Sequence, residues 1–169
     1  MSPPALLRLM READLPAVLA LQAACYHELE PESRATLESK RAAAARSCWI
    51  AERDGQALAY LFTLPWRFDA PPALDARCEG LPLAADTLYI HDLAIAPGAR
   101  GQGIGERLVD AALAFGRAEG LERSSLIAVQ GAQRYWQRHG YRPLDPLSAT
   151  IAERLEGYPS GACYMWRAL

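Results

Sequence analysis

Apolar and polar positions along the chain follow two periods, one typical of strands and one typical of helices. Short apolar runs bounded by turn residues predict strands at residues 6–10, 48–51, 57–64, 87–96, 125–129 and 163–167. Apolar positions three and four residues apart predict helices at residues 15–26, 32–46, 104–119 and 132–139. This order of elements predicts an α/β chain with a mixed sheet and helices on both faces.

Turn and capping residues mark the ends of several elements. Asp14 is placed to cap the first helix, whose first turn holds Pro16. The pair Asp54-Gly55 suits a tight hairpin turn between two strands. Residues 67–86 lack a clear period and are predicted to form a long loop. Loops of that length inside compact domains are usually functional or mobile.

Composition narrows the class of protein. The 169 residues are 51% hydrophobic and 22% charged, with a formal net charge of −2. These values predict one folded domain over residues 1–169 and argue against nucleic-acid binding. No apolar stretch is long enough to span a membrane and no signal peptide is recognisable, so we expect a cytoplasmic protein. The four cysteines lie far apart and are expected to be reduced thiols without a metal.

The most informative segment joins the strand at residues 87–96 to the following helix. Glycines immediately precede the predicted start of a helix, where unpaired N–H groups and the helix dipole favour binding of an anion such as phosphate. The spacing excludes two common phosphate loops. Ile104 stands where the Walker motif needs lysine, and Glu106 stands where the dinucleotide motif needs its third glycine.

Two motifs instead resemble one enzyme family. The run Arg100-Gly101-Gln102-Gly103-Ile104-Gly105 matches the pattern Arg/Gln-x-x-Gly-x-Gly/Ala. Residues 132–141 look like the ending Ala-x-x-Phe-Tyr-x-x-x-Gly-Phe. Both motifs, in this order and at this separation, resemble those of the GNAT superfamily of acyl-CoA-dependent N-acetyltransferases, and the resemblance covers nearly the whole chain.

The resemblance implies an α/β (α+β) GNAT fold with a mixed, mostly antiparallel sheet. It implies acetyl-CoA as cosubstrate without a metal, a small-molecule amine as acceptor, and a monomer or homodimer. Backbone amides of the glycine loop would hold the pyrophosphate, and the strand before it would hold the pantetheine arm. The residues implied in cofactor binding are Leu93, Ala94, Ile95, Arg100, Gly101, Gln102, Gly103, Ile104, Gly105 and Trp136.

An aliphatic amine is protonated at pH 7, so catalysis needs a base that titrates near neutrality. Strand alternation predicts that Tyr89, His91, Leu93 and Ile95 share the face toward the acyl arm and that Asp92 faces the opposite side. His91 is therefore the predicted base, and the alternative is a packed strand histidine. The local run is similar to that of arylalkylamine N-acetyltransferases, which carry histidines at the positions of Tyr89 and His91.

The proton donor to the leaving thiolate is left open. Many family members use a tyrosine where this chain has Trp136. The adjacent Tyr135 points roughly 100° away on a helix, so protonation by Tyr135, by another residue or by water stays open. Tyr89 is the catalytic candidate that would replace His91 if His91 is not the base. His27 has a weaker claim to a role in the acceptor pocket. His139, at a helix end where the dipole favours a partly positive imidazole, is assigned no catalytic role.

Other functions remain as alternatives. Trp136 at the tyrosine position favours a non-catalytic acyl-CoA-binding or sensing module, and the motif spacing disfavours a nucleotide-binding redox protein. For the acceptor, the acidic segments 67–86 and 28–32 indicate a cationic amine. Aromatic residues could equally line a pocket for an arylalkylamine, namely Tyr26, Trp66, Phe68 and Tyr89.

Overall fold

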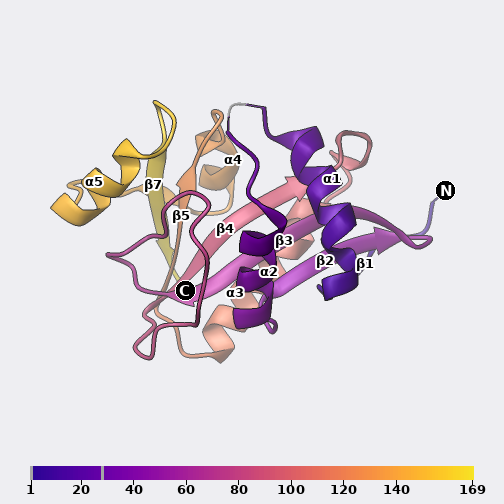
Figure 1. Cartoon of the computed structure of the whole chain (residues 1–169), viewed down its shortest axis with the longest axis horizontal. Helices are drawn as coiled ribbons and strands as arrows, with labels where there is room; N and C mark the ends of the chain where they lie inside the picture. The colour runs from indigo at the N-terminus through magenta and orange to yellow at the C-terminus, as the bar shows by residue number, and fades with distance from the viewer. Residues whose placement is uncertain (1, 28) are drawn as a thin grey trace.

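The computed structural model describes residues 2–27 and 29–169. Within these residues the strands form a seven-stranded sheet in the order β1-β2-β3-β4-β5-β7-β6 (Figure 1). β4 and β5 run parallel, and the other neighbours run antiparallel. The predicted mixed, mostly antiparallel sheet is confirmed. The strands are β1 Leu6–Leu9, β2 Cys48–Arg53, β3 Gln56–Trp66, β4 Thr87–Ile95, β5 Arg123–Ala128, β6 Arg142–Pro143 and β7 Cys163–Ala168.

Helices cover both faces of the sheet, as predicted. α1 and α2 lie in front of the sheet in Figure 1, and α3 lies behind it. Each face has its own apolar core, one built around Val18 and Leu37 and the other around Leu108 and Ala112. The helices are α1 Leu15–Cys25, α2 Arg34–Ala43, α3 Ile104–Ala118, α4 Gln133–Arg138 and α5 Ala149–Glu156, with short 3-10 helices at Glu12–Asp14 and Pro97–Ala99.

Local chemistry explains most of the element ends. Asp54 and Gly55 both have positive φ, 52° and 78°, which a tight β2–β3 hairpin requires. α2 begins at Arg34, later than predicted, because the Ser33 hydroxyl accepts a hydrogen bond from the Thr36 amide and caps the helix. It also ends earlier than predicted, at Ala43. The side chain of Asp14, in contrast, does not cap α1. It pairs with Arg8 instead, which corrects the predicted cap.

Besides the short 3-10 helices, one described strand and one described α-helix were not predicted. β6 is only two residues long and pairs with β7. α5 is one of the shorter helices, capped by the Ser148 hydroxyl and anchored by the fully buried Ile151. Among the described residues, no helix has both the length and the apolar character needed to cross a membrane.

A bulge in β4 corrects the predicted alternation of side chains. In the β3–β4 register, Asp92 lies opposite Phe62 and Ile90 lies opposite Thr63, so His91 is an extra residue. An inserted residue shifts the two-residue period of everything beyond it. His91 and Asp92 therefore both face the α1 and α2 side of the sheet, while Leu93 and Ile95 pack in the core on the α3 side.

Candidate active site

A cavity of about 710 Å³ lies where β4 and β5 separate. The parallel pairing of these strands ends at Ile90 and Leu126, so the later residues of β4 have no partner on β5. The cavity wall is completed by the start of α3, by α4, by the end of α1 and by the segment that follows α1. One continuous space thus reaches both the glycine loop and the middle of β4.

The glycine loop forms one end of this cavity. Gly101 and Gly103 both have φ of 76°, a left-handed conformation that L side chains rarely adopt. Gly103 immediately precedes α3, so the unpaired N–H groups of the first helical turn lie next to it. A Cβ at Gly105 would overlap the Tyr135 hydroxyl, so this glycine allows the close approach of α3 and α4. The loop therefore has the backbone geometry of an anion site.

The free edge of β4 leads away from the loop. The Leu93 carbonyl accepts a hydrogen bond from the Tyr26 hydroxyl at 2.9 Å, and the Ile95 carbonyl accepts one from the Arg100 guanidinium at 3.2 Å. These carbonyls are thus bound by side chains at a place where β5 supplies no partner residue. An extended ligand chain could pair with the same edge.

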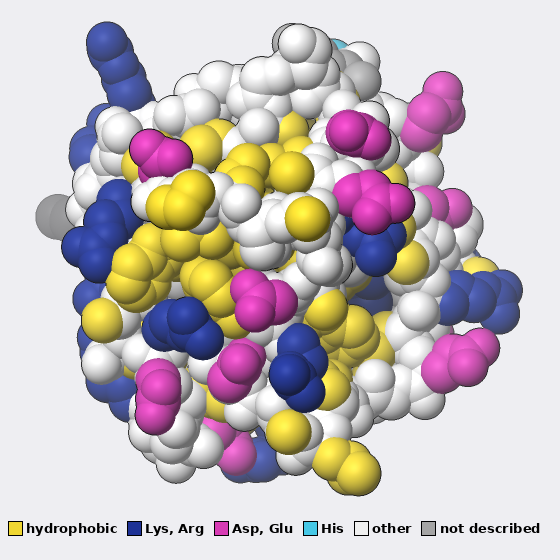
Figure 2. Space-filling view, turned by 90° about the vertical axis from the view of Figure 1, so that its left-hand side faces the viewer, with side chains coloured by type: hydrophobic (Ala, Val, Ile, Leu, Met, Phe, Trp, Pro, Cys, Tyr) yellow, Lys and Arg dark blue, Asp and Glu magenta, His cyan; other side chains and the backbone are white. Residues whose placement is uncertain are grey.

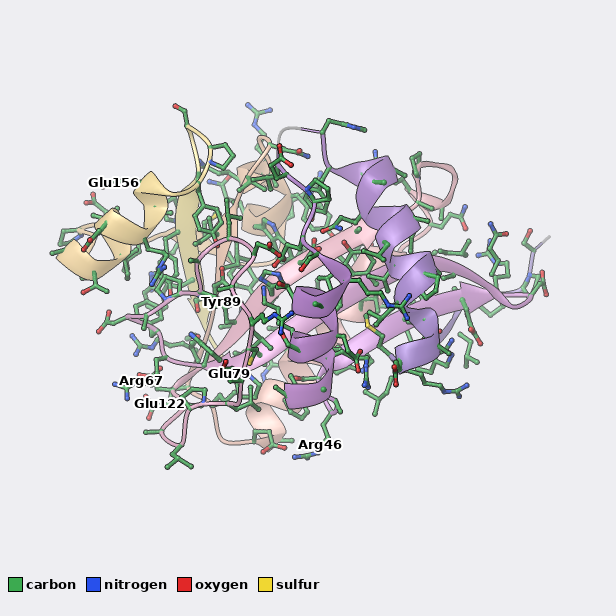
Figure 3. All side chains as sticks on the ribbon, viewed as in Figure 1. Arg46, Arg67, Glu79, Tyr89, Glu122 and Glu156 are labelled. Carbon is green, nitrogen blue, oxygen red and sulfur yellow. The ribbon has the colours of Figure 1, made fainter. Side chains whose placement is uncertain are left out.

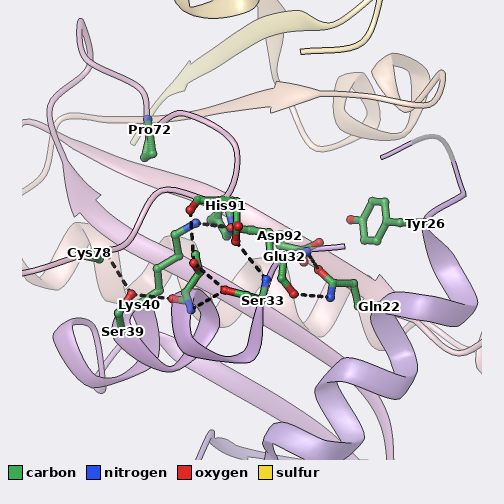
Figure 4. Close-up of polar contacts among 12 residues, drawn as sticks. Gln22, Tyr26, Glu32, Ser33, Ser39, Lys40, Pro72, Cys78, His91 and Asp92 are labelled. Atoms are coloured by element: carbon green, nitrogen blue, oxygen red, sulfur yellow. Dashed lines mark hydrogen bonds and ion pairs between the residues drawn. The ribbon is translucent and has the colours of Figure 1, made fainter. Parts of the chain in front are cut away.

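A buried polar cluster surrounds His91 (Figure 4). Its Nε2 atom contacts the Glu32 carboxylate and lies 3.0 Å from the Lys40 ammonium. Lys40 also bonds Glu32 at 2.8 Å, although its side chain is only 1% exposed. Burial alone would raise the pKa of Glu32, but electrostatic interactions and hydrogen bonds with His91 and Lys40 outweigh it and lower that pKa to about 2. Glu32 is therefore a carboxylate in this cluster.

Asp92 lies beside this cluster and lines the same cavity. One of its oxygens accepts a hydrogen bond from the Tyr60 hydroxyl at 2.6 Å, while the other oxygen, Oδ1, has no hydrogen-bond partner among the described residues. Burial raises the pKa of Asp92, and the neighbouring His91 and tyrosine hydroxyls partly oppose that shift.

Two adjacent aromatic residues of α4 also line the cavity. Trp136 is buried and packs edge-on against Tyr141, with ring centroids 5.5 Å apart. The hydroxyl of Tyr135 is buried without a hydrogen-bond partner in the described part of the chain, and burial raises its pKa to about 12. Tyr135 lies against Gly105, at the glycine-loop end of the cavity.

Comparison with known proteins places this fold and cavity in a family. The Acetyltransferase (GNAT) family matches residues 15–141 of the chain. The chain belongs to this family. No curated protein sequence matches it.

Solved GNAT structures share the fold at low sequence identity. The GphF GNAT-like decarboxylase, in complex with isobutyryl-CoA, is 20% identical over 96% of this chain and 98% of that chain, with a TM-score of 0.76. Ard1 from Thermoplasma volcanium is 15% identical over 99% of both chains, with a TM-score of 0.74. Rv2747 from Mycobacterium tuberculosis, in complex with CoA and NLQ, is 20% identical over 97% and 99%, with a TM-score of 0.69.

The family match supports an acyl-CoA cosubstrate, and the cavity fits one. A helix start with two left-handed glycines suits a pyrophosphate, and the edge of β4 that lacks a partner strand suits the amide groups of a pantetheine arm. Among residues 2–27 and 29–169, no group of three or more His, Cys, Asp or Glu is placed to hold a metal ion. The narrower resemblance to arylalkylamine N-acetyltransferases stays a prediction.

Most residues predicted to bind the cofactor do line the cavity. Gln102 does not, and its side chain bonds Arg53 and the Gly98 carbonyl. The lining members are Leu93, Ala94, Ile95, Arg100, Gly101, Gly103, Ile104, Gly105 and Trp136.

The predicted tyrosine and histidine candidates do not all lie at the cavity. Tyr89 and His91 line the same cavity, with ring centroids 6.4 Å apart, and Tyr89 is fully inside the molecule (Figure 3). His27 is exposed and does not line the cavity. His139 packs against Tyr135, and burial lowers its pKa, which opposes the charged form that we expected the helix dipole to favour.

The acidic segments only partly reach the cavity. None of the loop carboxylates Asp69, Asp75, Glu79 and Asp86 lines it. Asp75 instead accepts a hydrogen bond from the Ser33 amide and ties the loop to the start of α2. Glu30 and Glu32 do line the cavity, whereas residue 28 lies outside the described residues.

The distribution of charge on one outer face bears on nucleic-acid binding. Figure 2 shows the side of the molecule that carries α5 and the loop between β3 and β4. Basic and acidic side chains are interspersed there around apolar ones. This face does not present the continuous basic surface that nucleic-acid binding requires.

Three residues at or beside the cavity were not predicted as neighbours of His91 and Tyr89. Glu32 and Lys40 join His91 from distant positions in the chain, and Tyr158 reaches the cavity from just beyond α5, where its hydroxyl interacts with Tyr89. Lys40 lies on the same face of its helix as the apolar Leu37. A lysine on an apolar helix face is a weak sequence signal that could have indicated its buried contact with Glu32 and His91.

Proposed function

We propose that this GNAT protein is an N-acetyltransferase that moves an acetyl group from acetyl-CoA to a small primary amine. The observation that carries the proposal is the continuous cavity, which has the glycine loop at one end and the His91 cluster beside it. A cofactor anchored by its phosphates at the loop and extended along β4 would bring its thioester toward the bulge that presents His91.

The residues from Arg100 to Gly105 would hold the pyrophosphate through backbone amides, with the positive end of α3 adding to the attraction. Leu93 and Ile95 would bind the pantetheine amides through their main chains, because β5 leaves that edge without a strand partner. Trp136 would form an apolar wall of the same cavity.

The chemistry requires two protons to leave the ammonium form of the acceptor, one before the attack and one after it, and one proton to reach the leaving group. His91 would take a proton from the ammonium form of the acceptor, directly or through water. The free amine would then attack the thioester carbonyl, forming the C–N bond. Collapse of the tetrahedral intermediate would break the C–S bond, and the coenzyme A thiolate would leave without a covalent enzyme intermediate. The nitrogen would lose its second proton to water or to the leaving thiolate.

The leaving thiolate does not need a strong acid. A thiol has a pKa of about 8.5, so the thiolate is a competent leaving group and water can reprotonate it. Tyr135 is the protein group that we propose as an alternative donor, since its phenol remains protonated with a pKa of about 12. Tyr89 contributes to the wall beside His91 and is a further candidate.

A second function, binding of acyl-CoA without turnover, is favoured by Trp136, whose indole N–H does not titrate in the useful range. Turnover separates the two functions. We would incubate the purified protein with acetyl-CoA and a panel of primary amines, detect the released thiol, and identify the acetylated amine by mass spectrometry. Amine-dependent thiol release supports the transferase. Tight acetyl-CoA binding without release for any amine supports the binding module.

A further inference from the structure

The Glu32–Lys40–His91 cluster restricts which nitrogen of His91 can carry a proton. The Glu32 carboxylate bridges its two partners, with one oxygen on His91 Nε2 and the other 2.8 Å from Lys40 Nζ. Nδ1 of the same ring is buried and has no hydrogen-bond partner among the described residues. The two ring nitrogens therefore have opposite surroundings.

Each neutral tautomer can be tested against these contacts. With the proton on Nε2, the ring donates to the Glu32 carboxylate and the lone pair on Nδ1 is left over. With the proton on Nδ1, the lone pair on Nε2 could accept from Lys40 Nζ, 3.0 Å away, but it would still face the closer Glu32 carboxylate oxygen, and the buried Nδ1–H would lack an acceptor. Only the first arrangement gives the Glu32 carboxylate a donor from the ring, and solvent is a poor substitute because the His91 and Glu32 side chains are only 5% and 10% exposed.

We infer that Glu32 holds His91 as the Nε2–H tautomer and so makes Nδ1 the nitrogen that receives the acceptor's proton. This inference rests on the proposed role of His91 as the base. Glu32 then acts as a positioning residue, in the way that a buried carboxylate orients a catalytic imidazole elsewhere. Lys40 is a second positioning residue, since its charge keeps Glu32 ionised and its Nζ fixes the carboxylate.

The two neighbours should act on His91 with opposite sign. The carboxylate of Glu32 stabilises the imidazolium, whereas the ammonium of Lys40, 3.0 Å from Nε2, destabilises it. The other ionisable groups that face His91 come from its own strand, namely Asp92 and Tyr89. β3 contributes the apolar ring of Phe62 on the remaining side.

The direct test is the tautomer itself, measured on the full chain by long-range ¹H–¹⁵N correlation NMR. The chain has three histidines, so the variants His27→Gln and His139→Gln identify the His91 signals by elimination. We expect the neutral ring of His91 to carry its proton on Nε2 and the Glu32→Gln variant to lose this preference. A wild-type neutral ring protonated on Nδ1 would overturn the inference, and this readout requires neither turnover nor a folded Glu32 variant.

The second test is the pH dependence of kcat/KM. Glu32→Gln leaves Lys40 unopposed, so the acidic limb should move to lower pH by about one to three units. Lys40→Met leaves Glu32 unopposed, so the limb should move to higher pH. Glu38→Gln and Arg41→Met are matched controls, because this ion pair lies on the same helix without contacting His91. Shifts of the same sign, or none, would contradict the inference.

The failure of this inference differs from failure of the proposed function. If His91→Gln keeps normal turnover while wild-type His91 carries its proton on Nε2, the proposed base is wrong and the tautomer assignment stands. If His91→Gln is inactive while wild-type His91 carries its proton on Nδ1, the base stands and the positioning role of Glu32 is wrong.

Discussion

Replacement of Gly103 by valine tests whether the glycine loop binds the cofactor. Gly103 has φ of 76°, and a Cβ built on it meets no atom within 4 Å. A side chain at this position therefore strains the backbone without clashing with the protein, and it occupies space beside the first turn of α3. Forcing an L residue into the left-handed region costs about 1–2 kcal/mol.

The expected loss of stability is small enough for Gly103→Val to fold and be assayed. For a chain of this size, 1 kcal/mol shifts Tm by about 2–4 °C, so Gly103→Val should melt about 2–8 °C below wild type. Coenzyme A at about one hundred times its Kd should stabilise the wild type by about 2.7 kcal/mol, or about 5–11 °C. The ligand-induced shift should vanish in Gly103→Val, because the new side chain stands where the phosphates must approach.

Gly55→Val supplies the matched control. Gly55 has φ of 78° and open space around its Cβ position, but it lies in the β2–β3 turn, away from the cavity. The assay is thermal unfolding of both variants with and without coenzyme A. Gly55→Val should lose similar stability and keep the full ligand-induced shift. A correctly folded Gly103→Val protein with unchanged coenzyme A affinity would refute the loop assignment.

Two further predictions concern other parts of the cavity. In steady-state kinetics with acetyl-CoA, Trp136→Tyr should retain or raise kcat. Trp136→Phe should lose far less than the 10²–10⁴-fold in kcat expected when a general acid is removed. A loss of that full size in Trp136→Phe would make Trp136 part of the chemistry. The pKa of Glu32 is depressed from 4.5 to about 2, so its stabilising contribution is complete above pH 4.5 and lost as the pH falls toward 2. Thermal melts should show the Tm gap between wild type and Glu32→Gln closing over that range, and a gap that stays constant would contradict the assigned ion pair.

Features encoded by neighbouring residues were predictable from the sequence. The hairpin at Asp54 and Gly55 depends on two residues that accept positive φ, and both have it. The helix after Gly103 follows from a glycine at its start and apolar residues four apart, such as Leu108 and Ala112, which are fully buried. Such signals act over one turn of chain, so no knowledge of the fold is needed to read them.

The bulge at His91 could not be predicted in the same way. Alternation places Leu93 and His91 on one face, and nothing in the residues of β4 marks an extra position. The bulge is a property of the pairing with β3, where Phe62 and Thr63 set the shifted register. This single residue reverses the sides of Asp92 and Leu93, and so it decides which carboxylate lies beside the histidine.

The partners of His91 were hidden for a related reason. Glu32 is 59 residues away in sequence and Lys40 is 51 residues away, so the fold alone brings them together. Taken from the sequence, Lys40 is one more cation in a charged helix and Glu32 belongs to an acidic turn. Only the packing of α2 against the sheet buries them, and burial makes their mutual contacts necessary.

The most direct test of the central claim compares wild type with His91→Gln in one preparation series, measuring kcat with the best amine of the panel and coenzyme A affinity in parallel. If His91 is the base, kcat falls by about 10²–10⁴-fold, the acidic limb of the kcat/KM profile changes shape, and coenzyme A affinity is unchanged. A His91→Gln enzyme with near-normal kcat and an unchanged acidic limb would contradict the account and would direct attention to Asp92, Tyr89 or a water chain.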